Sequence, residues 1–124
     1  MHAIATAALA VFLVAVGVTH FLAPRYFRSL VPTPLARHAG ALVALSGVAE
    51  IVTGVLVAVP ATRALGAWTA AALITGYLSS HLDAARHARR DHPSPLWRPY
   101  GVAGRVAVNL LYIAWAAGVA LGAA

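Results

Sequence analysis

The chain has 124 residues, of which 61% are hydrophobic and only 10% charged, and its formal net charge is +6 at pH 7. A soluble domain carries about 25% charged residues, so this composition excludes an ordinary soluble protein and predicts a single domain embedded in a lipid bilayer. The absence of cysteine excludes disulfide exchange and thiolate metal sites. The clustering of arginines between apolar stretches indicates contact with anionic lipid and no nucleic-acid partner.

The first apolar stretch predicts a transmembrane helix over about residues 2–23. Residues 1–3 lack the positive charge that begins a signal peptide, so we expect this span to be retained. The loop 24–37 mixes prolines, arginines and aromatic residues, of which Tyr26 and Phe27 suit the headgroup level. We therefore expect a short interfacial helix in this loop.

Two further spans are predicted to form a hairpin. The second covers about residues 38–59, and the tiny loop 60–63 turns it back into a third span over about 64–83. Since the third stretch becomes polar only after Leu78, its helix should continue beyond the membrane to about residue 90.

The proline-rich loop 91–100 leads into a fourth predicted span over about residues 101–122. These spans predict an all-α fold, an integral membrane four-helix bundle with antiparallel neighbouring spans and a short interfacial segment after the first span. Most arginines lie in or beside loops 24–37 and 91–100. The positive-inside rule then places these loops in the cytoplasm and both termini outside the cell membrane.

Glu50, the only glutamate, lies in the middle of the second span. An ionisable group at that depth costs roughly 2.5–3.5 kcal/mol on insertion scales, so it is rare unless it is paired or used. Helical spacing predicts the inward face of each neighbouring span. These faces are Ser46, Gly47, Glu50, Thr53 and Gly54 on the second; Thr69, Ala72, Gly76, Ser79 and Asp83 on the third; and Arg105, Asn109, Tyr112 and Ala116 on the fourth.

The polar residues of the spans fall mainly in the half of the bilayer that faces the arginine-rich loops. We expect them to line a polar cleft that opens to the cytoplasm and ends at Glu50. The candidate ligand-binding residues are His20, Glu50, His81, Arg105, Asn109 and Tyr112. Arg105 offers a planar fork to a carboxylate and would keep Glu50 ionised, unless it reaches lipid phosphate instead.

The candidate residues also have purely structural interpretations. Glu50 can fix helix register through an ion pair or hydrogen bond, or it can transfer protons or bind a ligand. His20 can cap the first span, or it can relay protons or donate to a ligand. His20 and His81 could hold a haem between facing helices, but nothing in their spacing demands one. No two metal-ligating residues share a helix at i, i+3 or i+4 inside the membrane, so we predict no metal site.

Two motifs carry a family resemblance. Gly17-Val18-Thr19-His20-Phe21-Leu22-Ala23-Pro24 is followed by Phe27 and Val31-Pro32, and then by Ser46-Gly47-x-x-Glu50. Together they resemble the DoxX-like family of small four-helix prokaryotic membrane proteins. In that pattern the fourth span begins Arg-Leu-Pro-x-Gln, and here it reads Arg105-Val106-Ala107-Val108-Asn109. The resemblance implies a cytoplasmic-membrane protein linked to the quinone pool, because some relatives are small subunits of quinone-linked oxidoreductases.

Three functional hypotheses follow. The first is an accessory subunit of a redox complex, beside a larger partner, with a cleft that binds quinone or another amphipathic lipid. The second is a structural or interaction protein whose polar residues only fix helix packing. The third is a membrane enzyme in which Glu50 and His20 transfer protons on a lipid-like substrate, although a stand-alone enzyme is the lesser expectation. The Ala- and Gly-rich faces could also pack between copies as a homo-oligomer.

Overall fold

The computed structural model describes residues 1–123 and confirms that the fold is all-α, with five α-helices. Four of the helices are long: α1 (His2–Leu22), α3 (Ala39–Ala58), α4 (Arg63–Arg86) and α5 (Pro99–Ala123). The short helix α2 (Pro24–Leu30) follows α1 after a break at Ala23. Short 3-10 turns occupy Thr33–His38, Pro60–Thr62 and Pro95–Trp97.

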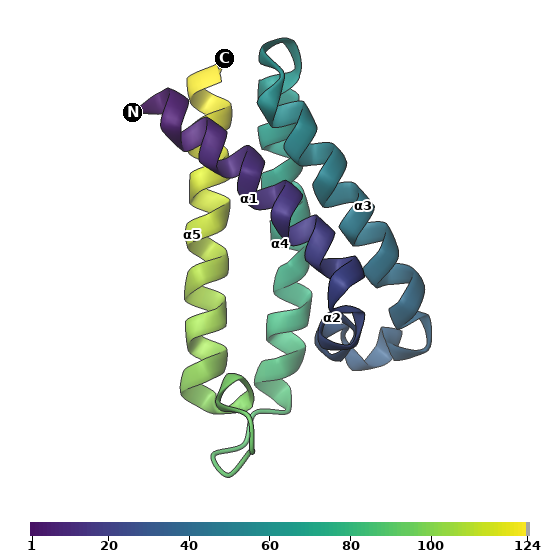
Figure 1. Cartoon of the computed structure of the whole chain (residues 1–124). Coiled ribbons are helices and arrows are strands. Elements are labelled where there is room, and N and C mark those ends of the chain that lie inside the picture. The colour runs from purple at the N-terminus through teal and green to yellow at the C-terminus, as the bar shows by residue number, and fades with distance from the viewer. Residues whose placement is uncertain (124) are drawn as a thin grey trace.

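The long helices are arranged as two pairs, and consecutive long helices run in opposite directions (Figure 1). Helix α1 packs along α3, and α4 packs along α5. The pairs meet at the end that carries both termini, where the Trp115 indole donates a hydrogen bond to the Ala5 carbonyl at 3.0 Å. The apolar core lies towards this end and includes Leu9, Leu13, Val57 and Val119. At the opposite end the pairs diverge, and α2 lies across the opening (Figure 1).

Glycines on α1 and α3 allow the two helices to approach closely within one turn of Glu50. A Cβ atom on Gly17 would lie 2.7 Å from the Gly47 carbonyl oxygen, and a Cβ on Gly47 would lie 2.8 Å from the Cβ of His20. Such contacts exclude any larger residue without a shift of the backbone. The same close approach brings His20 of α1 next to Glu50 of α3.

The segment after α1 is attached to α4 by side chains of α4. The Ser80 hydroxyl donates to the carbonyl of Leu30, the last residue of α2. The Asp83 carboxylate accepts hydrogen bonds from both the backbone amide and the hydroxyl of Thr33, each at 3.0 Å. These long-range bonds hold α2 and the following turn across the open end of the molecule.

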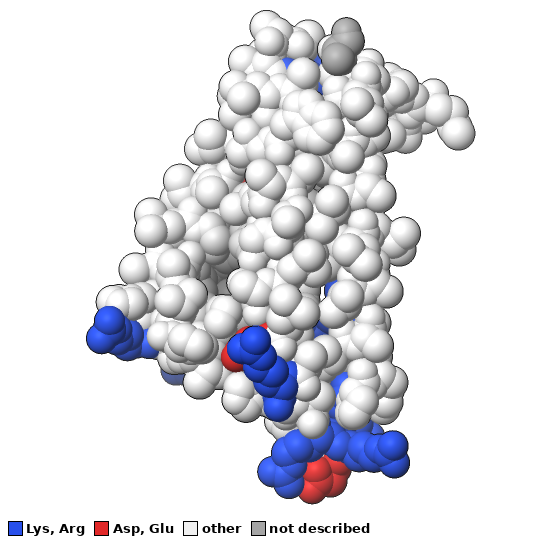
Figure 2. All heavy atoms as spheres, turned by 180° about the vertical axis from the view of Figure 1, so that it is seen from behind, with Lys and Arg blue, Asp and Glu red and all other residues white. Residues whose placement is uncertain are grey.

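Three stretches of residues 1–123 are long and apolar enough to cross a membrane by length and composition, and these are His2–Leu22, Thr33–Ala58 and Pro99–Ala123. Helix α4, expected to supply a span over 64–83, is not among them, because Ser79, Ser80 and His81 lower its hydropathy. Many large apolar side chains are exposed along the helices. Figure 2 shows that the arginines gather mainly at one end of the molecule, below a broad face with few charges.

Two expectations for α4 differ from the structure. The helix ends at Arg86 rather than near residue 90, and the Arg89 amide instead donates to the Trp97 carbonyl across the loop at 3.2 Å. The predicted inward face was also wrong. Its members Thr69, Ala72 and Gly76 are exposed, and only Asp83 is buried. Ser79 is also exposed, although it lies at the edge of a cavity. The face of α4 that is buried consists of Gly66, Ala67, Ala70, Ala71, Ile74, Asp83 and Ala84.

Candidate functional site

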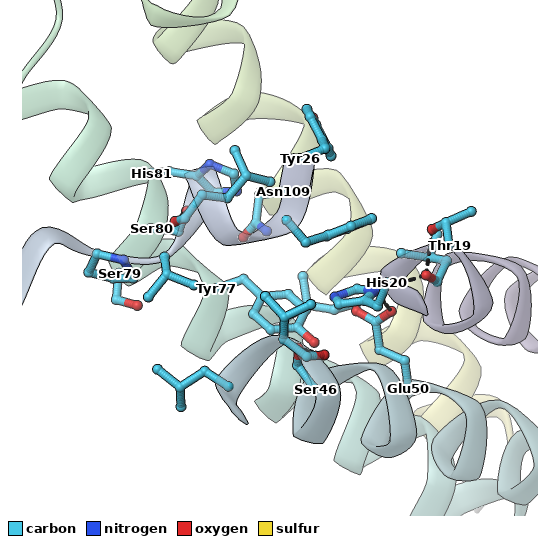
Figure 3. A pocket seen from close by; sticks show the side chains of 18 of the residues that line it. Thr19, His20, Tyr26, Ser46, Glu50, Tyr77, Ser79, Ser80, His81 and Asn109 are labelled. Carbon is cyan, nitrogen blue, oxygen red and sulfur yellow. Dashed lines mark hydrogen bonds and ion pairs between the residues drawn. The ribbon is translucent and has the colours of Figure 1, made fainter. Parts of the chain in front are cut away.

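A cavity of about 520 Å³ lies between the diverging helix pairs, beneath α2. Its wall is mostly apolar, with Phe12 and Leu13 from α1, Val43 from α3 and Ile74 from α4. Polar side chains from every long helix also line it. Figure 3 labels Thr19, His20, Ser46, Glu50, Tyr77, Ser79, Ser80, His81 and Asn109. Tyr112 of α5 is a further lining residue. The cavity thus combines a large apolar surface with a few grouped polar atoms, as small-molecule sites do.

Glu50 is the most deeply placed charged residue in the cavity, with only 3% of its surface exposed. Its nearest basic partner is His20, whose Nδ1 lies 3.5 Å from the Glu50 Oε2 atom. That nitrogen also donates to the Val16 carbonyl at 2.9 Å, because a carbonyl can only accept. The Glu50 Oε2 atom therefore accepts no well-formed hydrogen bond among residues 1–123, and the Tyr77 hydroxyl is a second donor close to the carboxylate.

His20 is held in place from two sides. Its bond to Val16 orients the ring along α1, and the Phe27 ring of α2 stacks on it, with 3.8 Å between centroids and 21° between planes. Phe27 therefore lines the cavity rather than serving only as a headgroup anchor. This arrangement joins the closing segment α2 directly to the His20–Glu50 pair.

Two further polar groups at the cavity lack a well-formed hydrogen bond within the described residues. The Asn109 Oδ1 atom is buried and accepts none. The Tyr77 hydroxyl lies close to both Glu50 and Ser46, but neither contact is a well-aligned hydrogen bond. In Figure 3 the Tyr77 ring extends from α4 towards Ser46 and Glu50 on α3. Buried polar atoms are almost always satisfied in native proteins, so several unsatisfied atoms facing one cavity point to a missing partner.

Arg105 does not approach Glu50. Its Nε donates to the Nδ1 atom of His81 at 3.2 Å, and its guanidinium lies over the Trp97 ring, 5.3 Å from the centroid. Arg105 faces a second cavity of about 370 Å³, which adjoins the first and shares Tyr26, Leu30, His81, Asn109 and Tyr112 with it. The expected pairing of Arg105 with Glu50 is replaced by contacts to His81 and Trp97.

The residues selected from the sequence are therefore brought to two adjoining cavities. His20, Glu50, His81, Asn109 and Tyr112 all line the larger cavity, and Arg105 lines only the smaller one. Within residues 1–123, no group of three His, Asp or Glu side chains is placed to hold a metal ion.

Sequence reasoning missed Tyr77 as a site residue. It lies four residues before His81, so helical spacing would have placed both on the same face of α4. Phe27 carried no comparable signal, because its contact with His20 depends on how α2 folds back across the opening.

Comparison with known proteins gives one match. A family model described as "Domain of unknown function (DUF8561)" matches residues 9–120. No curated protein and no solved structure matches the chain significantly. The DoxX-like resemblance was therefore wrong, because the match over nearly the whole chain is to a different family. The short motifs around His20 and Glu50 were not specific enough to distinguish the two.

Proposed function

Since this chain belongs to the family described as "Domain of unknown function (DUF8561)", a description that assigns no activity, we propose a function from the cavities. The protein is a multi-pass membrane protein that binds an amphipathic, lipid-like molecule. The polar head of this ligand lies against Glu50, and its apolar body lies along the cavity wall.

Insertion in a membrane is supported by the exposed surface. Large apolar residues such as Val11, Leu45, Leu65 and Leu111 are more than half exposed, which is costly in water and favourable in lipid. Three stretches have the required length and composition. Helix α4 crosses with them in this proposal, because it forms a tight hairpin with α3 and packs along α5. The hydroxyls of Thr69, Thr75 and Ser79 donate to carbonyls of their own helix, which lowers the cost of placing them in lipid. The result is a four-helix membrane bundle.

The distribution of arginines supports an orientation. They gather at the end formed by α2 and the α4–α5 loop, and both termini lie at the other end (Figures 1 and 2). By the positive-inside rule, loops 24–37 and 91–100 are cytoplasmic and the termini are outside.

Ligand binding rests chiefly on one observation: the buried Glu50 carboxylate borders a cavity with room for a ligand and has no well-formed hydrogen bond to the protein. A buried acceptor without a donor is destabilising, so a hydroxyl or amide of a bound head group would offset that cost. The Asn109 Oδ1 and the Tyr77 hydroxyl provide further contacts for the same head group. A volume of about 520 Å³ lies in the range of ligand pockets, which is about 300–1,000 Å³.

Quinone remains the first probe to test, but as one amphipathic molecule among several. The proposed link to a redox complex came from the DoxX-like resemblance, and the family match removes that support. The cavity itself selects a polar head on an apolar body rather than a redox group.

Glu50→Gln tests this proposal directly. We expect wild-type protein, purified gently, to carry an amphipathic molecule that native mass spectrometry and lipid extraction detect. Ubiquinone and menaquinone are then added to the protein as defined probes. Glu50→Gln should lose this ligand, because the amide retains only one acceptor oxygen and adds a donor that the site does not match. Circular dichroism checks that the variant is folded.

Asp91→Asn is the matched control. It also removes one carboxylate, but from an exposed loop where Asp91 pairs with Arg89 at 2.9 Å. It should retain the ligand. A folded Glu50→Gln protein that keeps its ligand at wild-type occupancy would refute ligand binding by Glu50.

The 3.5 Å His20–Glu50 contact also supports a second candidate function, in which the polar cluster only fixes the packing of α1 on α3. In that case no small molecule co-purifies, and Glu50→Gln lowers the melting temperature without changing any ligand signal.

A further inference from the structure

Arg105 in the second turn of α5 is a partly buried cation for which residues 1–123 provide no anionic partner. Its Nε is used by His81, but its Nη1 and Nη2 atoms are buried and make no hydrogen bond. The guanidinium lies over the Trp97 ring, and this cation–π contact stabilises the positive charge. The ring does not accept hydrogen bonds from the Nη groups, which point outward in the plane of the guanidinium. These N–H donors are left without an acceptor in a side chain that lines the smaller cavity.

The acidic residues of the described chain are all engaged elsewhere. The sequence contains three of them. Asp83 accepts two hydrogen bonds from Thr33, Asp91 pairs with Arg89, and Glu50 lies beside His20. A guanidinium that is partly removed from water and has no counter-ion is destabilising, so an external anion is favoured at this position.

The second cavity has the size and lining to receive such an anion. It has a volume of about 370 Å³, with Tyr26 and Tyr112 beside Arg105 and the apolar side chains of Leu96 and Val108 on its wall. Gly104, one residue before Arg105, leaves open space, because a Cβ there would meet nothing within 4 Å. The site therefore offers a cationic fork at one side and an apolar surface at the other.

We infer that Arg105 binds a phosphate-class oxyanion, supplied either as the phosphodiester of a membrane lipid or as free inorganic phosphate. A planar guanidinium with two free Nη atoms matches two oxygens of a phosphate group. The surrounding arginines at this end of the molecule attract anions to it (Figure 2). The lipid source depends on the proposed membrane location, whereas free phosphate does not.

The experiment measures binding to lipid-depleted protein in a nonionic detergent. The probes are dioleoyl phosphatidylglycerol, dioleoylglycerol, which has the same acyl chains but no phosphate, and inorganic phosphate alone. Binding is followed by native mass spectrometry and by the shift in melting temperature. We expect phosphatidylglycerol to bind at least about tenfold more tightly than dioleoylglycerol, the size expected for charge-assisted hydrogen bonds. If inorganic phosphate gives the same stabilisation, free phosphate is the source; if only the lipid does, the source is the headgroup.

Arg105→Gln should reduce phosphatidylglycerol binding by about tenfold or more, and Arg105→Lys, which keeps the charge but loses the fork, should reduce it less. Arg90→Gln is the matched control, since Arg90 is an exposed arginine at the same end. It should bind the lipid as the wild type does. If Arg105→Gln does not fold, Arg105→Lys carries the test.

Equal binding of phosphatidylglycerol and dioleoylglycerol by the wild type would overturn the inference. So would unchanged phosphatidylglycerol binding in folded Arg105→Gln. Glu50→Gln should retain this binding, so loss of the Glu50 ligand and loss of the oxyanion are separate results. An equal loss in Glu50→Gln and Arg105→Gln would also refute the assignment to Arg105.

Discussion

At the scale of single residues, the larger cavity is defined by polar atoms that are buried but unsatisfied. The Glu50 Oε2, Asn109 Oδ1 and Tyr77 hydroxyl each lack a well-formed hydrogen bond among residues 1–123, although Tyr77 lies close to Glu50. Leaving a buried acceptor unpaired costs about 1–3 kcal/mol. A residue that binds a ligand through an otherwise unsatisfied atom should lower the free energy of unfolding of the ligand-free protein. A residue that only supports helix packing should raise it, so the effect of a substitution on stability distinguishes the two roles.

Asn109→Leu is expected to stabilise the ligand-free protein and to weaken ligand binding. Leucine has a similar size and removes the unsatisfied amide, so the free energy of unfolding without ligand should rise by about 1–3 kcal/mol. Thermal unfolding in detergent, with and without the co-purified ligand added back, measures both effects. A lower melting temperature in the ligand-free variant would show that the amide is satisfied and stabilising instead.

At the scale of elements, the site depends on the close approach of α1 and α3. Gly17 and Gly47 remove the side chains that would separate the helices, and this closeness places His20 within 3.5 Å of Glu50. Helix α2 then completes the site, because Phe27 stacks on His20 and Ser80 of α4 bonds to Leu30 at the end of α2. A change in the α1–α3 distance should therefore alter the site as well as stability.

Gly17→Ala should destabilise the protein by about 1–3 kcal/mol, because its Cβ would lie 2.7 Å from both the Gly47 carbonyl oxygen and the Ile51 side chain. Gly76→Ala is the matched control. Its Cβ would meet nothing within 4 Å, and alanine is favoured over glycine in a helix by about 1 kcal/mol. Chemical or thermal unfolding of both variants tests the difference, and equal stabilities would argue against close packing at Gly17.

At the scale of the whole molecule, charge and apolar surface are separated. The arginines lie mainly at the end with α2 and the α4–α5 loop, and exposed apolar side chains cover the helices (Figure 2). Both cavities lie towards the arginine-rich end. In the proposed orientation a ligand would reach them from the cytoplasmic leaflet or from the cytoplasm.

Cysteine labelling tests this orientation without a background, because the chain has no cysteine. Ala36→Cys and Ala61→Cys each change an exposed alanine, on loops at opposite ends of the molecule. In intact cells an impermeant maleimide should label Ala61→Cys, and Ala36→Cys should react only after the membrane is opened. The reverse pattern would place the termini in the cytoplasm, and labelling of both sites in intact cells would exclude the proposed topology.

The sequence by itself determined the all-α fold and the approximate bounds of the long helices. Of its six candidate residues, His20, Glu50, His81, Asn109 and Tyr112 line one cavity and Arg105 does not. Apolar stretches of suitable length set the helices, and prolines and charged residues mark their ends. The positions of the loops show which end of each helix lies on the same side of the molecule. Helical periodicity then allows the depth of each polar residue along its helix to be compared between neighbouring helices.

Only the tertiary structure decided which side of α4 is buried and which residue lies beside Glu50. Thr69 and Ser79 bond to carbonyls of their own helix, at 2.8 Å each, so their polarity did not require an inward position. Arg105 contacts His81 and Trp97 because α5 packs along α4, whereas Glu50 lies on α3 against α1. Depth in a bilayer can be counted along the chain, but the partner of each side chain depends on which helices pack together and how closely.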